Sequence, residues 1–169
     1  MTPEEIIDLA KDFRQCYNTN DAIEVANSIG INVIMRKQNT DDFKAHIVKF
    51  DKYTPFICVN ENFSPVSRNV LCAHELGHAI LHEDTVYNQF DTSTDMIKQK
   101  QEYEANLFAV AFLCDEDEFN MPFSQMNNYV LKRILDENIY VWVLSSEGIE
   151  IAYFYGYPLI KCSRYLQLW

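Results

Sequence analysis

The stretch Val70-Leu71-Cys72-Ala73-His74-Glu75-Leu76-Gly77-His78-Ala79-Ile80-Leu81-His82 decides how this chain can fold and which chemistry it can perform. Residues four apart lie on one face of an α-helix, so His74 and His78 project side by side, with Glu75 one step round the helix. This is the H-E-x-x-H arrangement of a zinc peptidase helix. Apolar residues fill most other positions, which predicts a buried helix with only its His/Glu edge open.

The residue types in this motif match the needs of metal-assisted hydrolysis. Neutral imidazoles suit Zn²⁺, a third protein ligand leaves the fourth position for water, and a nearby carboxylate takes that water's proton. A structural helix with incidental histidines is the alternative. Gly77 argues against it, because glycine inside a helix costs about 1 kcal/mol relative to alanine. We expect Gly77 to remove a side chain that would face the cleft or a packed strand.

Length and charge limit the other interpretations. The chain has 169 residues, 48% of them hydrophobic, which is enough for one domain with a core and too short for two comfortable ones. The net charge of -11 argues against binding to a phosphate backbone, so we expect no direct nucleic-acid partner. An acidic protein would be repelled by DNA.

Neither secretion nor membrane spanning is indicated. The N-terminal sequence does not resemble a secretory leader, and no run of eighteen apolar residues occurs, so we expect a cytoplasmic protein without a membrane partner. The cysteines are odd in number and widely spaced, mostly within apolar runs. This pattern favours reduced, buried thiols over disulfides or a cysteine-based zinc site. The five are Cys16, Cys58, Cys72, Cys114 and Cys162.

Local patterns predict an α+β chain. Capping residues and helical spacing predict a helix from Thr2 to about Tyr17 and a short helix that ends before Gly30. Strands are predicted over 31–35, 45–50 and 56–60, and three consecutive short strands joined by turns favour a small, mainly antiparallel sheet. The motif helix is predicted to begin at Ser64 or Ser67. A polar loop over 83–94 and a second long helix over about 96–113 follow, the latter apolar all round in its second half.

The C-terminal part is less regular. An amphipathic helix is predicted around 129–135. Residues 140–155 have the β-propensity of a hairpin, but tertiary context could make them helical, and the sequence alone leaves both possibilities open.

Two histidines need a third ligand, and Glu102 and Glu104 on the second long helix are the best candidates. Asn106 lies four residues after Glu102 and hence on its face, where its carbonyl group could accept a hydrogen bond from the distal N–H of a metal-binding histidine. Glu104 has Phe108 at that offset, which offers only packing. We therefore expect Glu102 to be the ligand, with Glu104 as the alternative. His82 has rotated off the shared face and is expected at the helix end or behind the ligands.

These residues resemble the ImmA/IrrE family of metallopeptidases. The family pattern is H-E-[LI]-G-H-x-[LI]-[LI]-H followed by E-x-x-A-[ND]-x-F-A. This chain matches it with residues 74–82 and with Glu102-Tyr103-Glu104-Ala105-Asn106-Leu107-Phe108-Ala109. The resemblance covers roughly residues 21–113. After the second motif the family usually continues L-L-M-P, where this chain has Phe112-Leu113-Cys114-Asp115.

The resemblance implies a zincin-like fold and a gluzincin-like zinc endopeptidase. Zn²⁺ would be bound by His74, His78 and Glu102, and Glu75 would be the general base. It implies a single metallopeptidase-like domain over 1–169, with a catalytic core of about 21–113 and a C-terminal region over 114–169 that is helical. The chain is similar to the stand-alone, mobile-element type, whose members act as anti-repressors by cutting a partner helix-turn-helix repressor.

Two other functions compete with this one. The chain could be a catalytically dormant binding module that sequesters a basic DNA-binding partner, as a regulatory or toxin–antitoxin component. Its acidic charge would speed association with such a partner. A DNA-binding regulator is disfavoured by the charge and by the lack of a convincing helix-turn-helix pattern.

Overall fold

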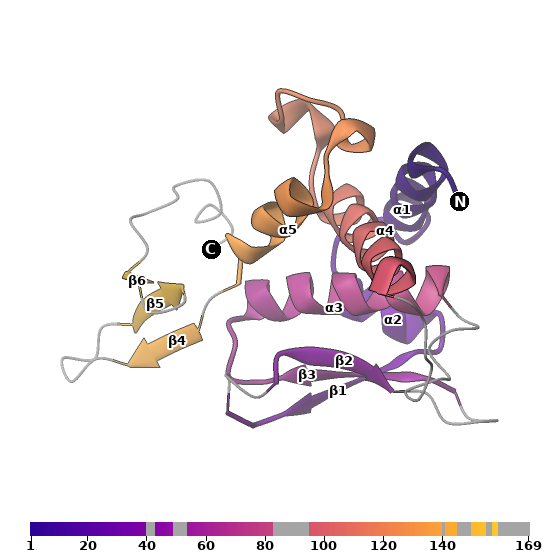
Figure 1. Cartoon of the computed structure of the whole chain (residues 1–169). Coiled ribbons are helices and arrows are strands. Elements are labelled where there is room, and N and C mark those ends of the chain that lie inside the picture. Colours follow the sequence, from indigo (N-terminus) through magenta and orange to yellow (C-terminus); the bar gives the residue numbers. More distant parts are fainter. Residues whose placement is uncertain are drawn as a thin grey trace.

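The computed structural model describes residues 1–39, 43–48, 54–82, 95–139, 141–144, 150–154 and 157–158. It confirms the predicted α+β class (Figure 1). The elements in chain order are α1 (Pro3–Tyr17), α2 (Ala22–Ser28), β1 (Asn32–Arg36), β2 (Ala45–Val48), β3 (Phe56–Asn60), α3 (Pro65–Leu81), α4 (Asp95–Leu113), the 3-10 helices η1 (Glu116–Glu118) and η2 (Phe123–Gln125), α5 (Asn128–Asp136), β4 (Val141–Leu144), β5 (Glu150–Phe154) and β6 (Tyr157–Pro158).

Side-chain caps begin the N-terminal helices where the sequence predicts them. The Glu5 N–H donates to the Thr2 hydroxyl at 3.3 Å, and the Thr2 N–H donates to the Glu5 carboxylate at 2.8 Å, which completes a capping box. Asp21 caps α2 and Ser64 caps α3. Gly30 follows α2 with a φ of 89°, a left-handed conformation that glycine adopts without strain.

The first sheet is mixed, so the prediction of a mainly antiparallel sheet is wrong in one of its two pairings. Its strand order is β1-β3-β2, with β1 parallel and β2 antiparallel to β3. The physical reason lies in β3, where Ile57, Cys58 and Val59 are all buried. A strand buried on both faces belongs in the centre of a sheet, and this leaves β1 and β2 at the edges.

Helix α3 lies between this sheet and α4 (Figure 1). Helix α3 contacts β2 and β3 of the sheet and also α4, and α4 in turn packs against α1. From Ala105 to Phe112 every residue of α4 is buried, as its apolar sequence predicts. The motif helix is therefore enclosed on two sides, and its position relative to α4 is set by packing.

Gly77 marks the closest approach of α3 and α4. A Cβ atom at Gly77 would lie 3.1 Å from both the Cα and the carbonyl oxygen of Ala105, and 3.3 Å from Cδ1 of Phe108. The glycine thus faces a neighbouring helix, so the expectation that it faces a cleft or a strand is wrong. Its missing side chain lets the two backbones meet.

The C-terminal region departs from what the family resemblance implies. Helix α5 is present, but β4 and β5 then pair in antiparallel fashion, with Val141 opposite Tyr153 and Leu144 opposite Glu150. β-propensity was therefore the better guide to the backbone of residues 141–144 and 150–154, and the implied helix is wrong for these two strands. β-branched and aromatic residues favour the extended conformation.

The structure tests part of the predictions about the cysteines, the loop over 83–94 and membrane-spanning segments. The described cysteines are free; Cys58 and Cys72 are buried as predicted, whereas Cys16 is exposed. Cys162 and the predicted polar loop over 83–94 lie outside the described residues. Among the described residues, no helix combines the length and apolar character needed to cross a membrane.

Adding a methyl group at position 77 tests the contact between α3 and α4. Gly77→Ala raises helix propensity by about 1 kcal/mol. We nevertheless expect a net loss of about 1–3 kcal/mol in the free energy of unfolding, because the methyl group would meet the backbone of Ala105, which cannot rotate away. Urea denaturation measures the difference. A variant more stable than the wild type would show that the helices do not approach this closely.

Glu116 forms hydrogen bonds both with α1 and with the segment that follows α4. Its Oε1 accepts the Phe123 N–H at 2.8 Å, and its Oε2 accepts from the Lys11 ammonium group at 3.2 Å. The hydrogen bond from Phe123 is the main reason why the pKa of Glu116 is lowered. A lowered pKa in the folded state stabilises the protein above the unfolded-state pKa, and this stabilisation disappears as the pH falls through the folded-state value.

We therefore expect Glu116→Ala to lower the free energy of unfolding by about 1 kcal/mol at pH 7, since the carboxylate is partly exposed to solvent. The deficit should shrink as the pH falls below about 4. Denaturant titrations between pH 3 and pH 7 measure it. Glu118→Ala, at an exposed position of the same 3-10 helix, is the matched control and should show neither effect. A deficit that does not change with pH would contradict the charge-based explanation.

Candidate metal centre

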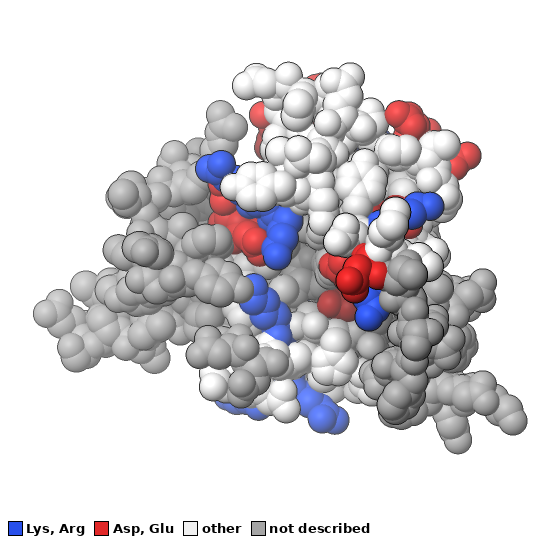
Figure 2. Space-filling view, in the orientation of Figure 1, with Lys and Arg blue, Asp and Glu red and all other residues white. Residues whose placement is uncertain are grey.

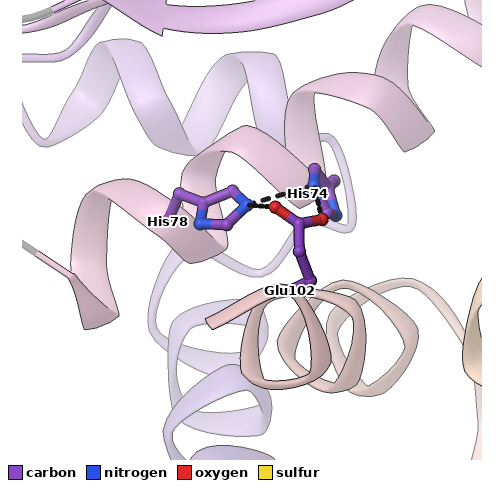
Figure 3. Close-up of side chains that lie close together, drawn as sticks. All are labelled: His74, His78 and Glu102. Carbon is purple, nitrogen blue, oxygen red and sulfur yellow. Dashed lines mark hydrogen bonds and ion pairs between the residues drawn. The ribbon is translucent and has the colours of Figure 1, made fainter. Parts of the chain in front are cut away.

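Three potential ligand atoms converge between α3 and α4. His74 and His78 project from α3, and Glu102 reaches them from α4 (Figure 3). The Nε2 atoms of the two histidines lie 3.2 Å apart. Oε1 of Glu102 lies 3.3 Å from His78 Nε2, and its Oε2 lies 3.6 Å from His74 Nε2. Among the described residues, these three form the group of His, Cys, Asp and Glu side chains that could hold a metal ion.

The surroundings keep the imidazole of His74 available as a lone-pair donor. Burial lowers the pKa of His74 to about 4, and the neighbouring His78 acts in the same direction. His74 is therefore neutral near pH 7, as a metal ligand must be. The pKa of Glu102 is lowered as well, chiefly by its hydrogen bond with His78, so its carboxylate is ionised.

The structure separates the two carboxylates that the sequence offers as a third ligand. Successive helical positions rotate by about 100°, so Glu102 and Glu104 point to different sides of α4. The side chain of Glu102 is 52% exposed and faces the two histidines. That of Glu104 is 11% exposed, and its Oε2 lies 2.9 Å from His82 Nε2. Glu104 is thus directed away from the three converging ligand atoms.

Asn106 lies behind His74. The side chains of Asn106 and His74 are hydrogen-bonded, and this bond raises the pKa of His74 against the larger effect of burial. Asn106 also donates from Nδ2 to Oδ1 of Asn128 at 2.8 Å. The sequence points to Asn106 through its spacing from Glu102. It contains no comparable signal for Asn128, which belongs to α5 and comes close only in the folded chain.

His82 lies behind the other histidine. It is the C-terminal cap of α3, where the backbone leaves the helical conformation with φ of -126° and ψ of 38°. Its Nδ1 is 3.3 Å from Nδ1 of His78, and it is buried. The four-residue spacing of the three histidines was a signal for this contact, but the pairing of His82 with Glu104 could not be read from spacing.

Glu75 is anchored by the sheet. The backbone N–H of Ile47 in β2 donates to Oε2 of Glu75 at 2.9 Å. Burial raises the pKa of Glu75, and the nearby His78 and this backbone hydrogen bond partly oppose the shift. A carboxylate whose pKa is raised toward neutrality is suited both to accept and to release a proton.

Figure 2 shows one face of the molecule, on which the described residues include charged side chains of both signs. Acidic and basic side chains are interspersed there, so no patch of a single sign forms among the described residues of this face. Lys132 of α5 lies near enough to lower the pKa of Glu102 and of His74. The exposed Lys132 therefore brings a positive charge close to the candidate centre.

Comparison with known proteins agrees with this geometry. A model of the family described as IrrE N-terminal-like domain (Peptidase_M78) matches residues 26–156. The chain is also 37% identical over 97 residues to "Uncharacterized immunity region protein 2" of Bacillus phage phi105. The aligned part is 57% of this chain and 60% of that relative, so the chain spans less than two thirds of the relative's length. No solved structure gives a significant match.

The family match includes the whole of α3 and α4, and thus every residue that contributes a ligand atom to the candidate centre. This agrees with the ImmA/IrrE resemblance that the two sequence motifs carry. The chain therefore belongs to the IrrE N-terminal-like (ImmA/IrrE) family and contains a metallopeptidase-type domain.

Proposed function

We propose that the protein is a zinc-dependent endopeptidase in which His74, His78 and Glu102 hold the metal and Glu75 is the general base. The convergence of the three ligand atoms carries the proposal. Ligand atoms about 2.1 Å from a tetrahedral zinc ion lie about 3.4 Å from one another. The two Nε2 atoms lie 3.2 Å apart, Oε1 of Glu102 lies 3.3 Å from His78 Nε2, and its Oε2 lies 3.6 Å from His74 Nε2, so the separations are close to those that a shared zinc ion requires.

When bound, zinc supplies Lewis-acid chemistry, by polarising a peptide carbonyl and acidifying water. Glu75 accepts the proton of the attacking water and delivers it to the leaving amine. The Ile47 N–H holds one oxygen of the Glu75 carboxylate in place, which orients the carboxylate relative to the two histidines. The exposed edge of Glu102 leaves the centre open on the side of α4.

Strand β2 offers a place for an extended peptide. It is an edge strand that pairs with β3 on one side, and its Ile47 N–H points to Glu75. A substrate added alongside this edge would bring a scissile bond close to Glu75. We treat residues 21–113 as the catalytic core of a single domain over 1–169, to which α5 contributes the support of Asn106 through Asn128.

As substrate we propose a helix-turn-helix repressor. The ImmA/IrrE resemblance supports an anti-repressor role, and the relative named as a phage immunity region protein is in keeping with it. The alternative is sequestration of a basic partner without cleavage. That alternative rests on the net charge of -11, and on the face in Figure 2 the described acidic side chains are interspersed with basic ones.

We expect the protein to bind one zinc ion and to lose it when a ligand is removed. His74→Ala and His78→Ala should abolish zinc retention after gel filtration, because two protein ligands hold zinc poorly. His46→Ala is the matched control, since His46 is an exposed histidine of β2 outside the metal group. Elemental analysis of the purified proteins measures the zinc content. Zinc retained in all three variants would place the metal elsewhere.

Glu75→Gln should separate binding from chemistry. Glutamine can still accept the hydrogen bond from Ile47 but cannot act as a base, so we expect zinc to remain and cleavage to fall by about 100- to 10,000-fold. The assay mixes purified protein with a helix-turn-helix repressor from the same genetic region and detects fragments by mass spectrometry. Arms with chelator and with the exposed control variant Glu118→Gln complete the design.

Discrete fragments with zinc that disappear with chelator and in Glu75→Gln, but persist in Glu118→Gln, would establish the peptidase and identify its substrate. A repressor bound tightly but left intact in every arm would contradict the peptidase and favour sequestration.

A further inference from the structure

A continuous line of polar contacts leads from the proposed ligand His78 to a buried carboxylate. Nδ1 of His78 lies 3.3 Å from Nδ1 of His82, and Nε2 of His82 lies 2.9 Å from Oε2 of Glu104. The other ring nitrogen of His78, Nε2, faces His74 and Glu102. The line therefore starts from the side of the His78 ring opposite the proposed metal.

The two residues behind His78 in this line, His82 and Glu104, have buried side chains that can carry a charge. The side chains of His82 and Glu104 are 7% and 11% exposed. Burying a carboxylate is costly unless it is paired and hydrogen-bonded, and His82 is the partner at hydrogen-bond distance. Lys100 makes a longer contact of 3.8 Å with the other oxygen of Glu104, from a largely exposed position. The main partner of Glu104 is thus the residue that caps α3 at its C-terminus, directly behind a proposed metal ligand.

Hydrogen-bond chemistry allows one proton arrangement along this line when a metal is bound. A metal ligand must present a lone pair, so His78 Nε2 is unprotonated and Nδ1 carries the hydrogen. That N–H needs an acceptor, which is Nδ1 of His82. A neutral imidazole with a lone pair on Nδ1 carries its hydrogen on Nε2, and this N–H donates to the Glu104 carboxylate. Each step fixes the tautomer of the next residue.

We propose that Glu104 and His82 are positioning residues that orient the His78 ring and hold it in the tautomer that binds zinc. This inference rests on the zinc site proposed above. Glu104 is the last hydrogen-bond acceptor of the line. By accepting from Nε2 of His82, it leaves Nδ1 of His82 as an acceptor for the N–H of His78. Neither residue touches the metal.

The two histidine ligands are then supported differently. His74 is backed by the neutral amide of Asn106, whereas His78 is backed, through His82, by a carboxylate. A carboxylate behind a ligating histidine raises the basicity of that ligand. His78 is therefore the ligand whose contribution to zinc affinity depends most on groups behind it.

Zinc affinity measured against a chromophoric chelator tests this proposal. His82→Leu removes the contacts with His78 and with Glu104 and should weaken zinc binding by about 10- to 100-fold, as is usual when the partner of a ligating histidine is lost. Glu104→Gln keeps an acceptor but removes the charge, so it should give a smaller loss. His82→Gln offers an amide oxygen and an amide N–H in one side chain and should restore most of the affinity. Glu118→Gln is the control for loss of a carboxylate and should match the wild type.

A spectroscopic measurement reports the proton positions directly. In the zinc-loaded wild-type protein, long-range ¹H–¹⁵N correlation spectra should show His78 protonated at Nδ1 and His82 protonated at Nε2. Thermal unfolding in chelator checks that each variant folds without metal, so that a loss of affinity is not a loss of structure.

The results separate the two proposals. If the wild type binds zinc and depends on His74, but His82→Leu and Glu104→Gln bind within about threefold of it, the metal site stands and the positioning role is overturned. Equal losses in His82→Gln and His82→Leu, or a proton on Nδ1 of His82, would overturn it as well. A wild-type protein without zinc affinity would overturn both proposals.

Discussion

The contact between the backbones of α3 and α4 at Gly77 and Ala105 is the constraint on which the proposed centre depends. His78 follows Gly77 by one residue, and Glu102 precedes Ala105 by less than one helical turn. The separation of the two helix axes at this point therefore sets the distance between the carboxylate and the imidazoles. Packed helices do not shift continuously, because their side chains interlock, so this separation is well defined. Gly77 thus lowers the helix propensity of α3 but allows α3 and α4 to pack closely.

The same arrangement leaves the candidate centre buried on the side of His82, Glu104 and Asn106 and exposed on the side of Glu102. Behind the histidines lie Asn106 and the pair of His82 and Glu104, all buried, whereas Glu102 at the front is half exposed. Burial keeps His74 neutral, and the hydrogen bonds behind the rings leave their Nε2 atoms directed at Glu102. In the proposed enzyme, the buried side would orient the histidine rings, and the exposed side is where water and a peptide would enter. Glu75 joins this centre to the sheet through Ile47.

Much of the fold followed from local patterns, and the errors have identifiable causes. Thr2 caps α1 where the sequence predicts it, and Ser64, one of the two predicted starts, caps α3, since capping depends on neighbours in sequence. The order of the first sheet was missed because neighbouring strands in sequence were taken as neighbours in space. The consecutive burial of Ile57, Cys58 and Val59 shows that β3 is central, and the unbroken apolar run was the signal. The sequence left helix and hairpin open over 140–155, and the helix that the resemblance implies is absent at 141–144 and 150–154, where β-propensity favours strands.

The sequence by itself determined the motif helix, the facing of His74 and His78, and the preference for Glu102 over Glu104, because each depends on spacing along one helix. The tertiary structure decided what these side chains meet. It brought α4 against Gly77, directed Glu104 to His82, and supplied Asn128 and the Ile47 N–H from distant segments. Such contacts join residues far apart in the chain, and their geometry depends on how whole elements pack, which periodicity along one element does not encode.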